Sequence, residues 1–172
     1  PGYVDIHSHG AWGSSFDDGE KGITTARAGH MAHGTTRQVL SLITNPIDVI
    51  CGNLKTVHDM MPDRPDILGA HLEGPFLAMP RKGAHDPNCL VDPTPDLVSR
   101  MLDAADGCLR QITIAPELPH GIDAIRRFFL AGVVPAVGHC DADYQTARKG
   151  FDAGAGIMTH MFNAMNGLHH RD

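Results

Sequence analysis

The sequence lacks a long hydrophobic run, a paired cysteine motif and a cluster of basic residues. Its longest apolar stretch, residues 128–137, is interrupted by Gly132 and Pro135, so it cannot span a bilayer. The four cysteines are widely spaced with no Cys-x-x-Cys pair. We therefore expect reduced thiols rather than a disulfide framework or a zinc knuckle.

The charge balance is acidic. The 172 residues contain 14 Lys and Arg against 20 Asp and Glu, a formal net charge of −6. With no run of Lys or Arg, this balance argues against nucleic acid or an anionic membrane as a partner. No signal-peptide pattern opens the chain, so we expect a cytoplasmic protein. A hydrophobic content of 42% is that of an ordinary globular domain.

Short apolar runs alternate with helical patterns along the chain. The runs predict strands at residues 4–6, 36–43, 67–72, 109–115, 133–138 and 156–159. Between them we expect helices over 24–33 and 46–61, a helix capped by Thr94, a helix with Ile122, Ile125 and Phe129 on its apolar stripe, and a helix capped by Asp141. Such alternation predicts parallel strands joined by right-handed crossovers.

Two architectures fit this order. Six units in 172 residues is roughly 29 residues per unit, the pace of a (β/α)₈ barrel that lacks two of its eight units. A doubly wound open sheet is the alternative, and composition and periodicity do not decide between the two. In either architecture the irregular stretch 75–93 is the candidate active-site loop.

The chain contains 12 histidines, and several directly follow predicted strands. In a parallel barrel the carboxyl ends of the strands meet at one rim, which would bring together His7, His9, Glu73, His139 and His160. One histidine after a strand is more often structural than a ligand, but five such residues at one rim favour a metal site. Imidazoles and a carboxylate suit Zn²⁺ or a similar divalent ion, which activates water for attack on a carbonyl.

Six segments resemble, in this order, those of a known family: His7-Ser8-His9, His71-Leu72-Glu73-Gly74-Pro75-Phe76, Lys82-Gly83-Ala84-His85, Ala115-Pro116-Glu117, Gly138-His139 and Thr159-His160-Met161-Phe162-Asn163-Ala164-Met165. The family is that of the N-acetylglucosamine-6-phosphate deacetylases, in the amidohydrolase superfamily. The resemblance runs over the whole chain. Its Leu-Glu-Gly-Pro and Thr-His-x-Phe-Asn-Ala-Met segments are the most specific.

The resemblance implies an amidohydrolase-type (β/α)₈ barrel, of which about six units are present. It implies hydrolysis of the acetamide of N-acetylglucosamine 6-phosphate to glucosamine 6-phosphate and acetate. By position, Glu73, His139 and His160 match the ligands of the main metal ion. His7 and His9 match the pair that binds a second ion in some members, with Glu73 bridging. One or two divalent ions, of zinc, are therefore expected in each subunit.

Substrate contacts are implied in the same way. Ala84 and His85 lie in the loop after the third strand, where the family's histidine polarises the acetamide carbonyl. Asn163 and Ala164 match backbone that meets the sugar phosphate. Arg171 matches a phosphate-binding arginine that reaches into the neighbouring subunit, so the resemblance implies a homodimer.

Three departures from the family are visible. A small β-domain built from both termini and the last two barrel strands have no counterpart in residues 1–172. The family's catalytic aspartate follows the eighth strand, so the printed chain is expected to be a partial catalytic barrel that is inactive alone. Asn166-Gly167 replaces a proline-containing stretch, which predicts a more mobile phosphate loop.

Other interpretations stay open at this point. The chain is alternatively part of another metal-dependent amidohydrolase, or an inactive fragment that binds metal or a phosphosugar. His30, His33 and His58 fall in helices and are expected far from the rim. Glu117 is expected in a structural role, and Cys89 and Cys140 as unreactive thiols.

Overall fold

A curled sheet of six parallel strands forms the centre of the protein, in a computed structural model that describes residues 1–168 and 170. The strands are β1 (Tyr3–Asp5), β4 (Thr35–Ile43), β5 (Ile67–Glu73), β6 (Leu109–Ile114), β7 (Val134–Val137) and β8 (Ile157–Met158). Their order in the sheet is their order in the chain. A doubly wound sheet reverses its strand order, so that alternative is wrong.

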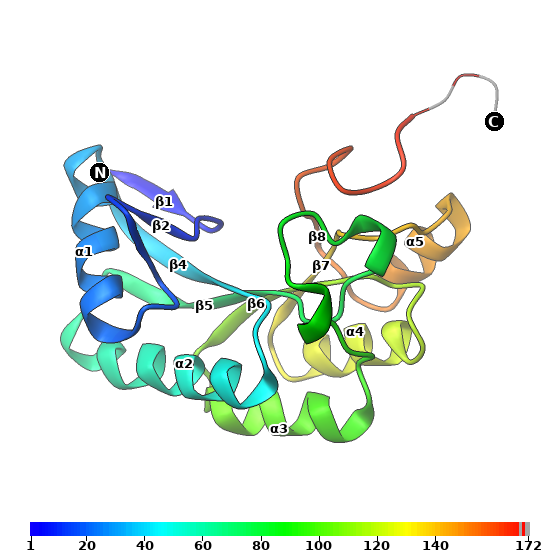
Figure 1. The fold of residues 1–172 in the computed structure, drawn as a ribbon, viewed down its shortest axis with the longest axis horizontal. Coiled ribbons are helices and arrows are strands. Elements are labelled where there is room, and N and C mark those ends of the chain that lie inside the picture. The colour runs from blue at the N-terminus through cyan, green and yellow to red at the C-terminus, as the bar shows by residue number, and fades with distance from the viewer. Residues whose placement is uncertain (169, 171–172) are drawn as a thin grey trace.

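Helices follow the strands and lie along the outer side of the curled sheet (Figure 1). They are α1 (Gly19–Ala32), α2 (Ile47–Met60), α3 (Pro95–Ala105), α4 (Gly121–Leu130) and α5 (Tyr144–Asp152), with short 3₁₀ turns η1 (Met61–Asp63), η2 (Met79–Arg81) and η3 (Pro87–Cys89). Within the described part of the chain, no helix is both long enough and apolar enough to cross a membrane.

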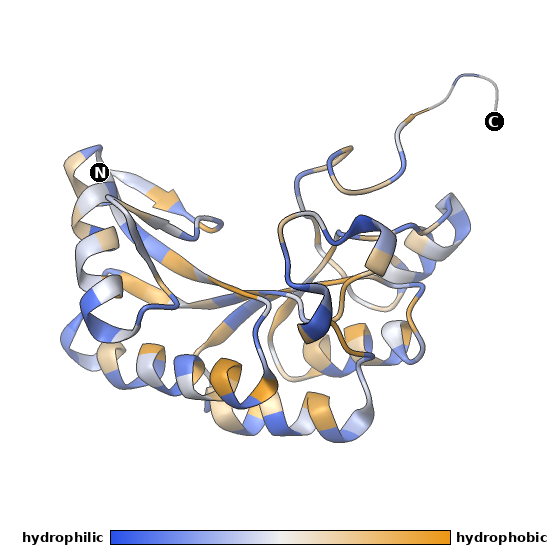
Figure 2. Ribbon diagram, viewed as in Figure 1, coloured by the Kyte–Doolittle hydropathy of each residue, from blue (hydrophilic) through white to orange (hydrophobic). Residues whose placement is uncertain are grey.

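The apolar core lies between the sheet and these helices, and Figure 2 shows hydrophobic residues on both the strands and the helices. Leu40, Leu72 and Ile112 contribute from the strands, and Leu54 and Phe128 from the helices. Side chains alternate between the two faces of a strand, so the residue next to each core residue points to the inner face of the sheet. Several buried residues on the inner face are polar: Ser41, His71, Thr113 and Thr159.

Two helix starts differ from the sequence-based expectation. Helix α1 begins at Gly19, five residues before the predicted start. Helix α5 is capped by Asp143, whose carboxylate accepts the Thr146 N–H at 2.7 Å, so the assignment of Asp141 as the cap is wrong. Asp141 instead accepts a hydrogen bond from Arg81 Nε at 2.8 Å. Two aspartates close together offered the same local signal, and only tertiary contacts separate them.

A small antiparallel pair was not predicted. Strands β2 (Gly10–Ala11) and β3 (Ser14–Ser15) are joined by Trp12 and Gly13, whose φ angles are +52° and +73°. Two central residues with positive φ are typical of the tight hairpin turn that matches strand twist. Strands of two residues are too short to show periodicity in a sequence.

The predicted apolar stripe of α4 is wrong at one position. Ile125 and Phe128 are fully buried against the sheet, whereas Phe129 is 53% exposed. The helical period of 3.6 places 125 and 128 on one face, and 129 falls at its edge.

These adjacent phenylalanines give a matched pair for a stability test. Phe128→Ala should lower the free energy of unfolding of the intact protein by about 3–5 kcal/mol, because it leaves a cavity in the core. Phe129→Ala should lower it by much less, because half of that ring is already in water. Chemical denaturation measures both. Equal losses would contradict the position of the core.

Candidate metal centre

A single buried carboxylate, that of Glu73, lies at the carboxyl end of β5 among imidazole rings. The Nε2 atoms of five histidines approach its oxygens: His7 at 3.4 Å, His9 at 2.8 Å, His85 at 3.6 Å, His139 at 3.2 Å and His160 at 3.0 Å. Burial raises the pKa of this carboxyl, but the surrounding rings outweigh burial and hold the pKa well below its usual range. Glu73 is therefore ionised.

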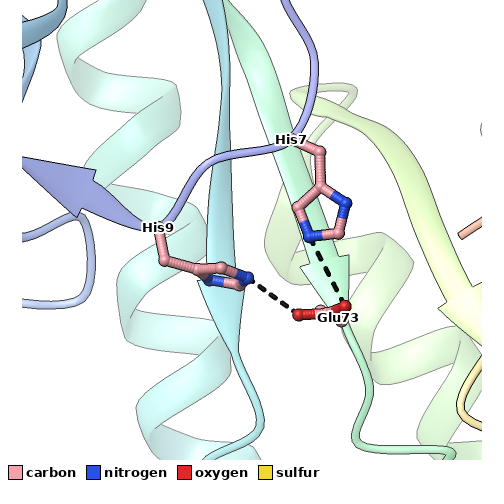
Figure 3. A group of neighbouring side chains, drawn as sticks. All are labelled: His7, His9 and Glu73. Carbon is pink, nitrogen blue, oxygen red and sulfur yellow. Dashed lines mark hydrogen bonds and ion pairs between the residues drawn. The ribbon is translucent and has the colours of Figure 1, made fainter. Parts of the chain in front are cut away.

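The side chains form two groups that share this carboxylate. His7, His9 and Glu73 make one group, and Glu73, His139 and His160 make the other. In each, the potential ligand atoms lie within 4.8 Å of one another. Figure 3 shows His7 and His9 approaching different oxygens of Glu73 from the segment between β1 and β2. All five side chains that the sequence placed at one rim thus lie together.

Two of these histidines have a defined tautomer. His139 Nδ1 lies 2.8 Å from the Arg81 carbonyl oxygen, and His160 Nδ1 lies 3.0 Å from that of Asn163. A carbonyl oxygen only accepts, so each Nδ1 carries the proton. In the neutral ring, Nε2 then presents a lone pair to the centre.

The spacing of the candidate ligand atoms shows whether a metal ion fits between them. The two Nε2 atoms of His139 and His160 are 3.0 Å apart, and each also lies 3.0–3.2 Å from Glu73 Oε1. Lone-pair atoms at these distances repel one another unless a proton or a metal cation lies between them. Ligands about 2.0–2.1 Å from a tetrahedral ion are roughly 3.3 Å apart, close to this spacing. The donor set therefore fits a divalent ion.

The backbone aims these side chains in an unusual way. His139 and His160, which follow β7 and β8, have φ angles of +49° and +29°. Non-glycine residues rarely adopt this left-handed region, and such positions cluster at functional sites. Gly74, after Glu73, has a φ of +88°, and a Cβ there would lie 2.2 Å from Thr44 Oγ1. Only glycine leaves room for Thr44 to donate to the Glu73 carbonyl oxygen at 3.0 Å.

His85 reaches the centre from the loop after β5. Its ring is buried, and its Nδ1 lies 2.8 Å from Thr44 Oγ1. Because the Thr44 hydroxyl hydrogen is directed to Glu73, the oxygen of Thr44 accepts and His85 Nδ1 donates. Nε2 of His85 therefore faces the carboxylate. The preceding residue, Ala84, is exposed beside the site.

The segment after β8 contains the other predicted substrate contacts. The Asn163 carbonyl orients His160, and the Asn163 N–H donates to the His160 carbonyl oxygen at 2.9 Å, so that N–H is already in use. Ala164 is half-buried and has a φ of +51°. Arg171 lies outside the residues that the structure describes.

Asn166 anchors the same segment. Its side-chain oxygen accepts from Arg81, and its Nδ2 donates to the carbonyl oxygens of Asp141 at 3.2 Å and Ala142 at 3.3 Å. We expected a more mobile loop from Asn166-Gly167, yet this asparagine ties the loop to its neighbours. Arg81 also supplies the carbonyl that orients His139.

Most of the remaining histidines, acids and thiols have structural positions. His30 was expected far from the rim, and this is wrong: its ring lies 3.1 Å from the Gly10 carbonyl oxygen, beside the β2–β3 hairpin. Glu117 accepts the Asp141 N–H, and burial raises its pKa. Burial also raises the pKa of Cys140 to about 11, as expected for an unreactive thiol.

One further residue of the centre, His71, was not predicted from the sequence. His71 is fully buried two positions before Glu73 and packs edge-on against the His7 ring, with centroids 4.7 Å apart. Burial lowers its pKa to about 3, so the ring is neutral. Its spacing from Glu73, a period of two within a strand, was the available signal.

Fold and site together define an α/β protein with a candidate metal-binding centre at the carboxyl ends of a curled parallel sheet. No family model matches the chain. Among curated proteins it is 33% identical to the N-acetylglucosamine-6-phosphate deacetylase of Bos taurus and 34% identical to that of Vibrio furnissii, over 100% of this chain and 44% of each relative. It is 31% identical to an N-acetylgalactosamine-6-phosphate deacetylase of Escherichia coli O157:H7, over 100% of this chain and 47% of that protein.

Solved structures agree. The N-acetyl-D-glucosamine-6-phosphate deacetylase of Mycobacterium smegmatis matches with a TM-score of 0.95 and 41% identity over 99% of this chain and 49% of that one. An aspartate-to-alanine mutant of that enzyme, in complex with N-acetyl-D-glucosamine-6-phosphate, matches equally well, with 45% of its chain covered. The chain spans about half the length of the relatives it matches. These comparisons confirm the resemblance to N-acetylglucosamine-6-phosphate deacetylases. Similarity to this family implies a divalent metal ion.

Glu73 provides the direct test of the centre. Zn²⁺ should stabilise the chelator-treated intact protein by about 2.7 kcal/mol at a free concentration 100 times its Kd. Glu73→Gln should lose this stabilisation, because it removes the only carboxylate in either group. Thermal denaturation with and without Zn²⁺ measures both, and Asp59→Asn, which changes an exposed carboxylate on α2 outside both groups, is the control. Undiminished stabilisation of Glu73→Gln would contradict the assignment.

Proposed function

We propose that the protein to which this chain belongs hydrolyses the acetamide of N-acetylglucosamine 6-phosphate, giving glucosamine 6-phosphate and acetate, in the cytoplasm. The observation that carries this proposal is the convergence of five imidazole nitrogens on one ionised carboxylate at the strand ends. Relatives of that name, one of them solved with this sugar phosphate bound, support the choice of substrate.

Two zinc ions fit the proposal. Glu73, His139 and His160 would hold the first, and His7 and His9 the second, with the two oxygens of Glu73 shared between them. A divalent ion in such a site supplies Lewis acidity, which polarises a carbonyl and lowers the pKa of water. Glu73 and the fixed Nδ1–H bonds of His139 and His160 keep the donor atoms oriented.

His85 is proposed to act on the acetamide carbonyl. Its Nδ1 donates to Thr44, so Nε2 can donate only when the ring is doubly protonated. In that form its positive charge lies beside ionised Glu73, with 3.6 Å between Nε2 and Oε2. A donor held in this position stabilises negative charge that develops on the carbonyl oxygen.

The sugar phosphate is proposed to lie between two loops, with Ala84 and His85 on one and Asn163 and Ala164 on the other. Arg171 is proposed to bind the phosphate across a homodimer, which the family resemblance supports. A guanidinium fork suits the oxygens of a phosphate. Sedimentation of the intact protein tests the dimer, and a monomer alone would contradict it.

The remainder of the architecture is also a proposal. The six parallel strands would be six of the eight in a closed (β/α)₈ barrel, with two further strands pairing with the edges β1 and β8. A small β-domain and a catalytic aspartate would come from the rest of the protein. The span of about half of each relative and the solved aspartate-to-alanine mutant with its sugar phosphate support this.

A substrate panel tests the function. The intact protein should release acetate from N-acetylglucosamine 6-phosphate, and far more slowly from unphosphorylated N-acetylglucosamine, because the phosphate contacts are absent. The relative that is named for N-acetylgalactosamine 6-phosphate makes that sugar the necessary comparison. Preference for the galactose configuration would reassign the substrate, and no acetate from either would reject the proposal.

The role of His85 can be separated from binding. His85→Ala should lower kcat by about 10²–10³ with little change in KM, the effect of removing an oxyanion donor. His85→Gln should recover part of that loss, because its amide supplies a neutral donor. Steady-state kinetics of both variants checks this. A change confined to KM would show that His85 only binds substrate.

A further inference from the structure

A continuous chain of side-chain hydrogen bonds crosses the inner face of the sheet directly below the metal centre. Ser41 Oγ lies 2.9 Å from His71 Nδ1, and His71 Nε2 lies 2.9 Å from Thr113 Oγ1. Thr113 Oγ1 in turn lies 2.8 Å from Thr159 Oγ1. All four residues are buried. Barrel interiors are usually filled with branched apolar residues, so a polar layer here needs a reason.

The chain of hydrogen bonds passes over strand β7, which contributes no side chain to it. Thr113 is on β6 and Thr159 follows β8, and β7 lies between these strands. The two hydroxyls meet over Gly138. A Cβ on Gly138 would lie 2.6 Å from Thr159 Cβ and 3.0 Å from Thr113 Cγ2. The bare glycine thus makes room for the contact.

At its Ser41 end, this chain of hydrogen bonds contacts the segment that contains His7 and His9. Strand β1 ends at Asp5, so this segment is not part of the main sheet. Ser8 fastens it: its N–H donates to Ser41 Oγ at 3.2 Å, and its carbonyl accepts the Ser41 N–H at 3.1 Å. Ser41 Oγ is the atom that His71 contacts.

The two metal-binding groups differ in how they are held. His139 and His160 have Nδ1 atoms fixed by carbonyl oxygens. In contrast, Nδ1 of His9 is buried with no hydrogen-bond partner among the described residues.

Other contacts hold the two ends of the segment that contains His7 and His9: the His7 N–H donates to Asp5 Oδ1 at 3.0 Å, and the His9 carbonyl oxygen accepts the Phe16 N–H at 3.0 Å. Between the two histidines, the Ser8–Ser41 anchor fixes the segment to β4, and Ser41 is in turn bonded to His71.

We propose that His71 is a positioning residue for the second metal ion: bonded at both ring nitrogens, it fixes Ser41 and so holds His7 and His9 against Glu73. This rests on the proposed two-ion centre. Loss of the His71–Ser41 bond should release the His7–His9 segment and leave the Glu73–His139–His160 group in place. Removing groups that orient metal ligands typically lowers metal affinity by about 10–100-fold.

The test is a Zn²⁺ titration of the chelator-stripped intact protein against a competing chelating dye, which resolves two affinities. His71→Ala should weaken the second affinity by about 10–100-fold and change the first by less than about threefold. His71→Asn should restore most of the second affinity, because its amide occupies the place of Nδ1 and reaches Ser41. His71→Gln, whose amide occupies the place of Nε2 and reaches Thr113, should not.

Val39→Ala is the control for general loss of packing, since Val39 is buried on β4 two residues before Ser41. It should leave both affinities unchanged. If His71→Ala fails to fold, the contrast between His71→Asn and His71→Gln decides the question alone.

The outcomes separate the two claims. A wild-type protein that binds no Zn²⁺ overturns the proposed function. A wild-type protein that binds one ion only, or a His71→Ala variant that keeps both affinities, overturns the positioning role of His71. Equal second affinities in His71→Asn and His71→Gln would also overturn it, because the bond to Ser41 would then not matter.

Discussion

The ionised Glu73 carboxylate is the group around which the rest of the structure is arranged. A buried charge costs several kcal/mol unless its partners are complete and well oriented. Here the partners come from the segment after β1, the loop after β5 and the ends of β7 and β8. The left-handed backbone at His139 and His160 and the glycine after Glu73 serve the same requirement.

Much of this could be predicted from the sequence because the relevant signals are local. Apolar runs located all six parallel strands to within a few residues, and the metal-binding candidates were found because each lies at or shortly after the carboxyl end of a strand. The choice between barrel and doubly wound sheet could not be made in that way. Strand order depends on which runs pair, and both architectures have the same alternation of runs and helices.

What the sequence did not reveal depends on contacts between distant residues. His71 bonds to Ser41 and Thr113, which are 30 and 42 positions away, so its spacing of two from Glu73 indicates a shared face but not its partners. The same holds for His30, an ordinary helical histidine until the β2–β3 hairpin is placed beside it. Asp141 and Asp143 look alike as caps, and an arginine 60 residues away engages the first.

The position of β1 and β8 in the sheet gives the metal centre a mechanical meaning. These strands are the two edges, with the other four between them (Figure 1). His7 and His9 extend from one edge and His160 from the other, and all reach Glu73 on β5. The centre therefore joins side chains from both edges of the curled sheet through one carboxylate on an inner strand. Any change in the ligands of Glu73 is therefore felt at both edges of the sheet, which are far apart in the sequence.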